Sequence, residues 1–468
     1  MTFCNPVKAS ARAWLRQAIF ALGFAGAFLA LMPASPSYAQ PQNNAVFALR
    51  DTETEELLRS YTMPLARAAG LDPNMVRVFV MGDMSINAFA TQPQDIFIFA
   101  GMMLEVKTPN ELIGVLAHET GHISGGHLTR SVDAMQKASV PMLLSLVVGL
   151  AAMLAGAGPV GSAIMGMGQS LAMSDFNAFS RVQESAADQI AVKLLNATRQ
   201  SPAGMQNTFI RFAQEQARSS FRINKFAVSH PVGQDRVSAL QAAVDTSPYR
   251  DVPDPPQSVH ALQMIQAKLS GFILPVAETL RHYPTSNTSA AARYARAMAY
   301  MKQPNLQGAL DEINSLIKDE PNNPYYYEVL GQIHVMMAKP ALGIPAYQRS
   351  VSLKPQAPQL RMGLATAQLA TEDAALASQA LTNLKAALLA ENEDPFAWRQ
   401  AAKAYSLMKN PQMADLATAE SNYHAGNLSQ AFIFASRARA GLPQGGADWQ
   451  RANDIIGATQ GAMPQRRR

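Results

Sequence analysis

The chain has 468 residues, of which 48% are hydrophobic and 16% are charged, so it can form two or three domains with substantial cores. Its formal net charge of +5 includes three basic residues and no acid within positions 1–39, so the rest of the chain carries only +2. A charge this small gives no indication of a nucleic-acid partner. We interpret the basic tail at 466–468 as a solvated end.

Positions 1–39 have the composition of a secretory signal peptide. Basic residues precede an apolar stretch over 18–32, and small residues at 37–39 provide a cleavage site near Ala39. An uncleaved anchor is the weaker interpretation because two prolines interrupt the end of the apolar stretch. Cys4, the only cysteine, lies within this segment, so the mature chain has no thiol and no disulfide. We expect a location in the periplasm, free or peripheral to a membrane.

A β-strand is predicted over residues 95–99, where polar, aliphatic and aromatic side chains alternate as Asp-Ile-Phe-Ile-Phe. The short segment Asn87-Ala88-Phe89 comes just before it. We expect this strand to lie beside the helix that follows it in the sequence.

A helix is predicted from Pro109 to about Gly125. Thr108 and Glu111 form a capping box, and proline occupies the first helical position. Within this helix lies the sequence His118-Glu119-Thr120-Gly121-His122, an H-E-x-x-H motif.

This motif predicts a catalytic zinc site. Residues four apart on a helix are about 40° from eclipsed, so both imidazoles of His118 and His122 can reach one zinc ion. Glu119 then faces the open position of the metal and can take a proton from water that the metal activates. The flanking residues are apolar, and a buried His-Glu-His cluster without partners would cost several kcal/mol. A merely polar helix is therefore the weaker interpretation.

The third zinc ligand must come from elsewhere in the chain. A metzincin would place a histidine at position 128, which is Leu128. On a continuous helix His127 would be turned about 140° from His122, so we interpret His127 as a helix-end residue.

No charged residue occurs from Ala138 to Ser174, and Val140–Leu154 is almost wholly apolar. Glycines and a proline interrupt the segment near its middle, so two short helices fit better than one membrane span. Two alternatives remain open for residues 139–168: a hairpin buried between the zinc-binding helices, and a hairpin that contacts a membrane surface or substrate.

A further helix is predicted from Ser180 onward, and it carries Glu184 and Asp188 four residues apart. One carboxylate can bind the metal while the other accepts a hydrogen bond from a ligand histidine, which fixes the imidazole tautomer. Paired acids alone are common on solvated helices. Together with H-E-x-x-H, they indicate a metallopeptidase.

These motifs resemble the M48 gluzincin peptidases over about residues 55–240. The resemblance implies that His118, His122 and Glu184 bind a single Zn²⁺ ion, that Glu119 is the base, and that Asp188 orients a ligand. It implies a gluzincin-type α+β metallopeptidase domain.

The resemblance also implies a role for the loop histidine of Ser229-His230-Pro231, which can approach the zinc as a fourth ligand and hold the enzyme closed. A simple turn is the alternative. Arg236 could stabilise an oxyanion, although a salt bridge is the stronger expectation. Residues 85–90, including Asn87, Ala88 and Phe89, could bind extended substrate as an added strand.

A helical repeat array is predicted after a proline-rich stretch near residue 253. Large and small residues recur with the tetratricopeptide period of about 34, as in Tyr327, Leu330, Gly331, His334, Gly343, Tyr347 and Pro355 and, one period earlier, in Ala297, Tyr300, Ala309, Ile313 and Pro321. The proline spacing is longer between Pro358 and Pro395, which predicts an insertion. A generic helical bundle is the alternative.

The expected fold is therefore mainly α, with the metallopeptidase followed by an α-solenoid of tetratricopeptide repeats. The expected division is a signal peptide at 1–39, the peptidase at 40–250, connecting helices at 251–285, repeats at 286–446, and a C-terminal helix and tail at 447–468. We expect a periplasmic zinc endopeptidase that degrades misassembled outer-membrane and other envelope proteins and assists their assembly, with the repeats contacting substrate or assembly machinery. The alternative is a chaperone-like scaffold for outer-membrane protein clients, with a mostly latent zinc site.

Overall fold

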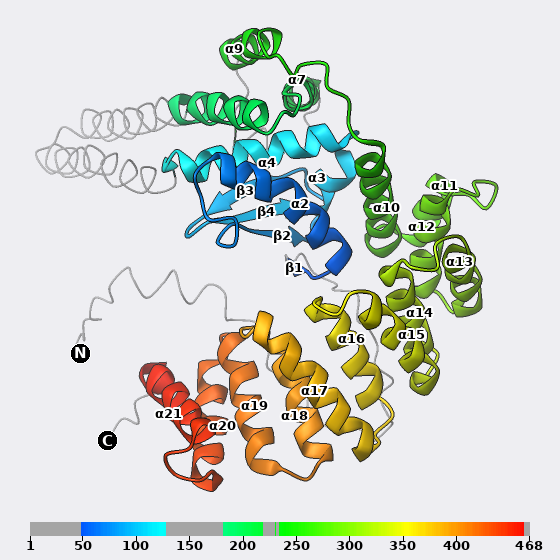
Figure 1. The fold of residues 1–468 in the computed structure, drawn as a ribbon, viewed down its shortest axis with the longest axis vertical. Coiled ribbons are helices and arrows are strands. Elements are labelled where there is room, and N and C mark those ends of the chain that lie inside the picture. The colour runs from blue at the N-terminus through cyan, green and yellow to red at the C-terminus, as the bar shows by residue number, and fades with distance from the viewer. Residues whose placement is uncertain (1–47, 128–180, 219–229, 231–233, 463–468) are drawn as a thin grey trace, which may run out of the picture. The chain divides into compact units, whose positions relative to one another are not determined.

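The computed structural model describes residues 48–127, 181–218, 230 and 234–462 (Figure 1). The predicted signal peptide, the apolar hairpin at 139–168 and the tail at 466–468 lie outside these ranges. Among the residues that are described, no helix has the length and apolar character needed to cross a membrane.

A small mixed sheet supports the N-terminal half. Its four strands are β1 (Ala48–Leu49), β2 (Arg77–Met81), β3 (Ala88–Thr91) and β4 (Asp95–Phe99), in the order β1-β2-β4-β3. The β2 and β4 strands are parallel, and the outer two pairs are antiparallel. The strand predicted at 95–99 is confirmed, and β3 lies at one edge of the sheet.

Alternation along β4 explains how the sheet joins the core. Ile96 and Ile98 are fully buried and face the helices, whereas Phe97 on the other face stacks between Phe79 and Phe89. The period of two that predicted this strand therefore separates a helix-facing layer from an aromatic layer.

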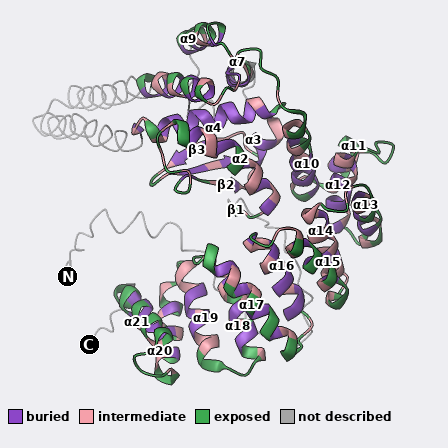
Figure 2. Ribbon diagram, in the orientation of Figure 1, coloured by how far each residue is buried: buried purple, intermediate pink, exposed green. Residues whose placement is uncertain are grey.

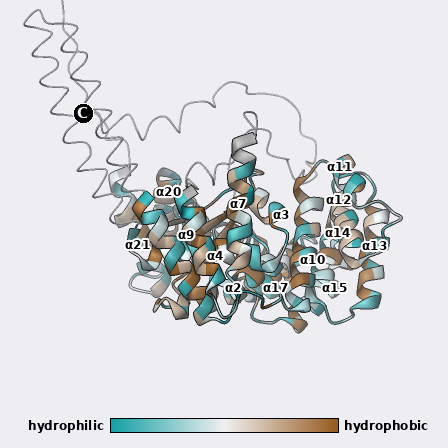
Figure 3. Cartoon of the chain, turned by 90° about the horizontal axis from the view of Figure 1, so that it is seen from above, coloured by the Kyte–Doolittle hydropathy of each residue, from teal (hydrophilic) through white to brown (hydrophobic). Residues whose placement is uncertain are grey.

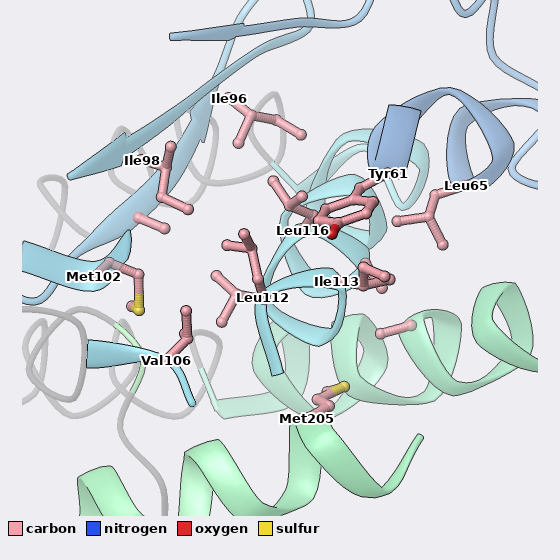
Figure 4. Packing of buried hydrophobic residues seen from close by; sticks show 14 of the residues in the cluster. Tyr61, Leu65, Ile96, Ile98, Met102, Val106, Leu112, Ile113, Leu116 and Met205 are labelled. Atoms are coloured by element: carbon pink, nitrogen blue, oxygen red, sulfur yellow. The ribbon is translucent and has the colours of Figure 1, made fainter. Parts of the chain in front are cut away.

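Helix α4 (Pro109–Ser124) crosses the centre of this core, and Figure 2 shows most of its length as buried. Its residues Leu112, Ile113 and Leu116 lie between the sheet and the side chains of α2 (Thr52–Ala68), as Figure 4 shows. The surrounding elements are α3 (Ala100–Glu105), a helix over residues 181–197, α7 (Ala203–Arg218) and α9 (Gln234–Asp245).

Helix α10 (Pro256–Ile273) follows the proline-rich stretch and contributes to two cores. Its residues Leu262, Ile265 and Leu269 belong to the core that contains α4. Met264 instead packs with Tyr294 and Tyr326 at the start of the repeat array. The short helix α11 (Val276–His282) leads from α10 into the repeats.

The repeat array consists of paired helices. They are α12 (Ala290–Met301) with α13 (Leu306–Asp319), α14 (Pro324–Met336) with α15 (Pro340–Leu353), α16 (Pro358–Leu369) with α17 (Ala374–Ala390), α18 (Pro395–Leu407) with α19 (Pro411–His424), and α20 (Leu428–Gly441) with α21 (Ala447–Thr459). Helices such as α12 and α13 are amphipathic (Figure 3). The α-solenoid that was predicted is confirmed.

The predicted insertion lies in α17. The first helices of the first three pairs begin at Ala290, Pro324 and Pro358, at the tetratricopeptide period. Helix α17 has 17 residues, whereas α13 and α15 each have 14. The three additional residues account for the longer spacing before Pro395.

Small residues at Gly331 and Gly363 hold the Tyr347 ring between two helices. A Cβ atom on Gly331 would lie 2.4 Å from Cδ2 of this ring, and a Cβ on Gly363 would lie 2.6 Å from its Cε1. Tyr347 is buried, so its ring cannot move away from either side.

We predict that Gly331→Ala destabilises the protein by about 1–3 kcal/mol, because the added methyl group overpacks the ring of Tyr347. The matched control is Gly457→Ala in α21, where a Cβ would meet no atom within 4 Å. That change should stabilise the helix by up to about 1 kcal/mol. Denaturant unfolding measures both, and equal effects of the two substitutions would contradict the packing argument.

Candidate metal centre

The start of α4 fixes the position of the histidine motif. Thr108 Oγ1 accepts a hydrogen bond from the backbone N–H of Glu111 at 3.2 Å, as predicted. The Glu111 carboxylate accepts from the Lys107 backbone at 2.8 Å and receives two bonds of 2.8 Å from Arg211 on α7. The helix is therefore capped and attached to its neighbour about two turns before His118.

Four potential ligands converge where α4 meets the helix over 181–197. His118 Nε2 lies 3.1 Å from His122 Nε2 and 3.3 Å from Glu184 Oε2, and His122 Nε2 lies 3.4 Å from Glu184 Oε1. His230 joins them, and ligand atoms of all four residues lie within 4.8 Å of one another. All four are buried.

This geometry fits a metal ion. Tetrahedral bonds of about 2.0–2.1 Å separate neighbouring ligand atoms by about 3.3 Å, which agrees with the three distances between His118, His122 and Glu184. Two imidazole nitrogens and a carboxylate oxygen form a ligand set that is found in catalytic zinc sites.

Without a metal, the charges of this cluster are balanced by protons. Burial disfavours a charged imidazole at His118, but hydrogen bonds with Asp188 and Glu184 outweigh burial and raise its pKa to about 9. Burial acts to raise the pKa of Glu184, but hydrogen bonds from His118 and His230 hold this pKa well below its usual range. Burial and the charge of His118 lower the pKa of His122.

Asp188 and Arg236 form the layer behind the ligands. Asp188 Oδ1 lies 3.0 Å from His118 Nδ1, on the side of the ring opposite the ligand cluster. Arg236, on α9, donates to both Asp188 oxygens at 2.7 and 2.9 Å and lies 3.1 Å from Glu184 Oε2. Its guanidinium therefore pairs with two buried carboxylates, in the salt bridge that was the stronger expectation.

Glu119 is a buried acid beside the ligand cluster. The residue is 0% exposed, and at strict geometry neither oxygen has a hydrogen-bond partner among the described residues. Burial raises its pKa, although the Ala90 backbone N–H acts to lower this pKa. His230 Nε2 lies 3.6 Å from Glu119 Oε1. A native protein retains such a group mainly where it serves chemistry.

The loop histidine lies directly on the cluster. His230 Nδ1 is 3.0 and 3.1 Å from the two oxygens of Glu184 and 3.3 Å from His118 Nε2. The expected approach of this residue to the site is thus observed, and its role as a ligand or regulator stays a prediction.

The segment proposed for substrate binding forms the edge of the sheet. Asn87 accepts a hydrogen bond at its backbone oxygen from Phe99, Ala88 is fully buried, and Phe89 packs on Phe97 and Phe99. The side chains of Ala88 and Phe89 are therefore engaged in packing within the domain. Peptide binding here would use the backbone of β3.

Sequence reasoning missed one contact of the site. His127 was interpreted as a helix-end residue that a continuous helix would turn away from His122, but α4 ends at Ser124, close to the predicted end near Gly125. His127 Nδ1 instead lies 3.2 Å from His122 Nδ1. The consecutive glycines Gly125 and Gly126 were the available signal for a helix end.

Arg236 should be essential to the fold of this region. We predict that Arg236→Met destabilises the metal-free protein by about 3–5 kcal/mol, because two buried carboxylates lose their counter-charge. Arg77→Met is the control: Arg77 makes a similar two-bond pair with Asp95, but its side chain is 52% exposed. We expect that change to cost about 1 kcal/mol or less in denaturant unfolding. Comparable losses in both variants would contradict the assigned role of burial.

Comparison with known proteins finds a family profile and related proteases. The sequence profile of peptidase family M48 matches residues 52–244. The beta-barrel assembly-enhancing proteases of Yersinia pestis and Escherichia coli (strain K12) are each 23% identical to this chain, over 85% and 87% of its length and 82% and 83% of theirs. Metalloprotease LoiP of Escherichia coli (strain K12) is 30% identical over 42% of this chain and 74% of that protein.

Among solved structures, MamA MSR-1 C2 matches 35% of this chain at 19% identity with a TM-score of 0.30, which is too low to support a conclusion about the fold.

Proposed function

The chain belongs to peptidase family M48 and is a metallopeptidase, and on this premise we propose that it is a periplasmic zinc endopeptidase acting on misassembled envelope proteins. The observation that carries the proposal is the buried cluster of His118, His122 and Glu184 at ligand spacing, with the carboxylate of Glu119 beside it. A purely structural metal site would leave Glu119 without a use.

We propose that Glu119 is the general base of peptide hydrolysis. When bound, one zinc ion per chain would supply Lewis acidity, which activates water and polarises a carbonyl group. Glu119 takes the proton of the attacking water and delivers it to the leaving amine. The pKa raised by burial makes this carboxylate a stronger base than an exposed glutamate, and Asp188 holds the His118 ring in place through Nδ1.

Substrate is proposed to bind in an extended form along β3. This strand pairs with β4 on one side, and no other described strand pairs with its free edge. A peptide added there would satisfy its backbone hydrogen bonds next to α4 before attack. If Arg236 also stabilises the oxyanion, its guanidinium must do so while it remains in the salt bridges with Glu184 and Asp188.

We propose that residues 40–250 carry the catalysis and that the repeats at 286–446 bind protein. Stacked helix pairs offer an extended surface suited to recognition. Two relatives that match most of this chain are named for enhancing β-barrel assembly, which supports outer-membrane proteins or their assembly machinery as partners. The same names, with the signal-like N-terminus, support the periplasm as the location.

We predict that Glu119→Gln retains zinc and loses peptide hydrolysis by about 10²–10⁴-fold, because the amide keeps the shape of the side chain and removes the base. His122→Ala should lose zinc and activity together. Metal analysis of the purified proteins and casein cleavage separate the two effects. Near-normal cleavage by Glu119→Gln would contradict the mechanism, and rescue of envelope proteins in cells by this variant would favour the scaffold alternative.

His230 is proposed to hold the resting enzyme closed. Its contacts with Glu184, His118 and Glu119 support this proposal, because a side chain there would compete with water for the metal.

We predict that His230→Ala raises basal proteolysis and self-cleavage several-fold while zinc content stays near one per chain. The control is His282→Ala on α11, a largely exposed histidine, which should leave both values unchanged. Unchanged or lower activity of His230→Ala would remove the regulatory role, and a complete loss would assign this side chain to catalysis.

A further inference from the structure

The helix α4 ends shortly after His122, and the residue that follows its terminal glycines contacts this ligand. The helix ends at Ser124, with Gly125 as its C-cap, and Gly126 has a φ of +65°. This left-handed conformation favours glycine and is typical of the residue that follows a helix end. The next residue, His127, is only 3% exposed.

Two contacts hold the ring of His127, and a third holds its backbone. A Cβ atom on Gly125 would lie 2.5 Å from His127 Nε2, so the ring packs directly over that glycine. Its ring stands edge-on to that of His122, with centroids 5.1 Å apart and an interplanar angle of 81°. Gln183 donates a side-chain hydrogen bond to the His127 backbone oxygen at 3.3 Å. The turn is thereby attached to the helix that carries Glu184.

The contact between the two rings has one consistent assignment of protons. His122 Nε2 faces His118 and Glu184 in the ligand cluster, so it must be unprotonated to bind a metal. The proton of the neutral ring then lies on Nδ1. Since His122 Nδ1 and His127 Nδ1 are 3.2 Å apart, the first donates and the second accepts. His127 must therefore carry its own proton on Nε2.

The two ligand histidines consequently have different partners. His118 Nδ1 faces the Asp188 carboxylate, and His122 Nδ1 faces an imidazole. Such partners behind a ligand histidine select its tautomer and hold its ring plane.

We infer that His127 is the positioning residue of the metal ligand His122, accepting the His122 Nδ1 proton at its own Nδ1 and so presenting His122 Nε2 to the zinc ion. This inference rests on the proposed function, because it needs zinc at the cluster. It assigns to His127 neither a bond to the metal nor a contact with substrate.

The test compares three substitutions in the full chain by their zinc dissociation constants, measured by competition with a chelator at fixed pH. His127→Leu removes the acceptor at similar volume and should raise the constant about 10–100-fold. His127→Asn places Oδ1 where Nδ1 lies and should stay within about threefold of the wild type, because Oδ1 can accept the same proton. Gly125→Ala displaces the ring and should weaken zinc binding while His127 is intact.

Nitrogen NMR of the zinc-loaded wild type tests the same inference independently of how the variants fold. His127 should show the tautomer protonated at Nε2, with its signal identified by its absence from His127→Asn. A His127 protonated at Nδ1, wild-type affinity in His127→Leu, or an equal loss in His127→Leu and His127→Asn would overturn the inference. If the wild type itself binds no zinc, the proposed function fails.

Discussion

The metal centre depends on the close approach of α4 to the helix over residues 181–197. At the point of contact stands Gly121, between the two histidines of the motif. A Cβ atom there would lie 2.8 Å from the backbone oxygen of Ala187. Any larger residue would push the helices apart, and the separations of 3.1–3.4 Å that suit a metal would be lost. A position that the motif leaves variable is thus restricted by packing.

Charge is the second constraint on this site. In the part of the chain that the structure describes, the buried carboxylates of Glu119, Glu184 and Asp188 lie near one guanidinium, that of Arg236. If all three are ionised and the imidazoles are neutral, two positive charges are lacking, which a divalent cation would supply. Without the ion, protonation of His118 compensates in part, in line with its pKa of about 9. The charge arrangement that favours zinc binding therefore destabilises the protein when no metal is bound.

Local sequence patterns predicted the helices and ligand spacings of the site. These local patterns did not predict the features that depend on tertiary contacts. The helix from Pro109 follows from its capping box, and the four-residue spacings of His118 and His122 and of Glu184 and Asp188 follow from helix geometry. That β3 is an edge strand could not be read from the sequence, because strand order is set by long-range pairing. The contact between His127 and His122 was not predicted, because it depends on the left-handed backbone at Gly126 and not on helical periodicity. The amino-acid composition likewise did not predict that α10 packs into two hydrophobic cores.

Anomalous X-ray diffraction at the zinc absorption edge, on crystals of the full chain, tests the central claim most directly. The account predicts one anomalous peak per chain, about 2 Å from Nε2 of His118, Nε2 of His122 and the carboxylate of Glu184. A peak at other residues, Asp188 as a ligand in place of Glu184, or no peak in protein purified with zinc would contradict it.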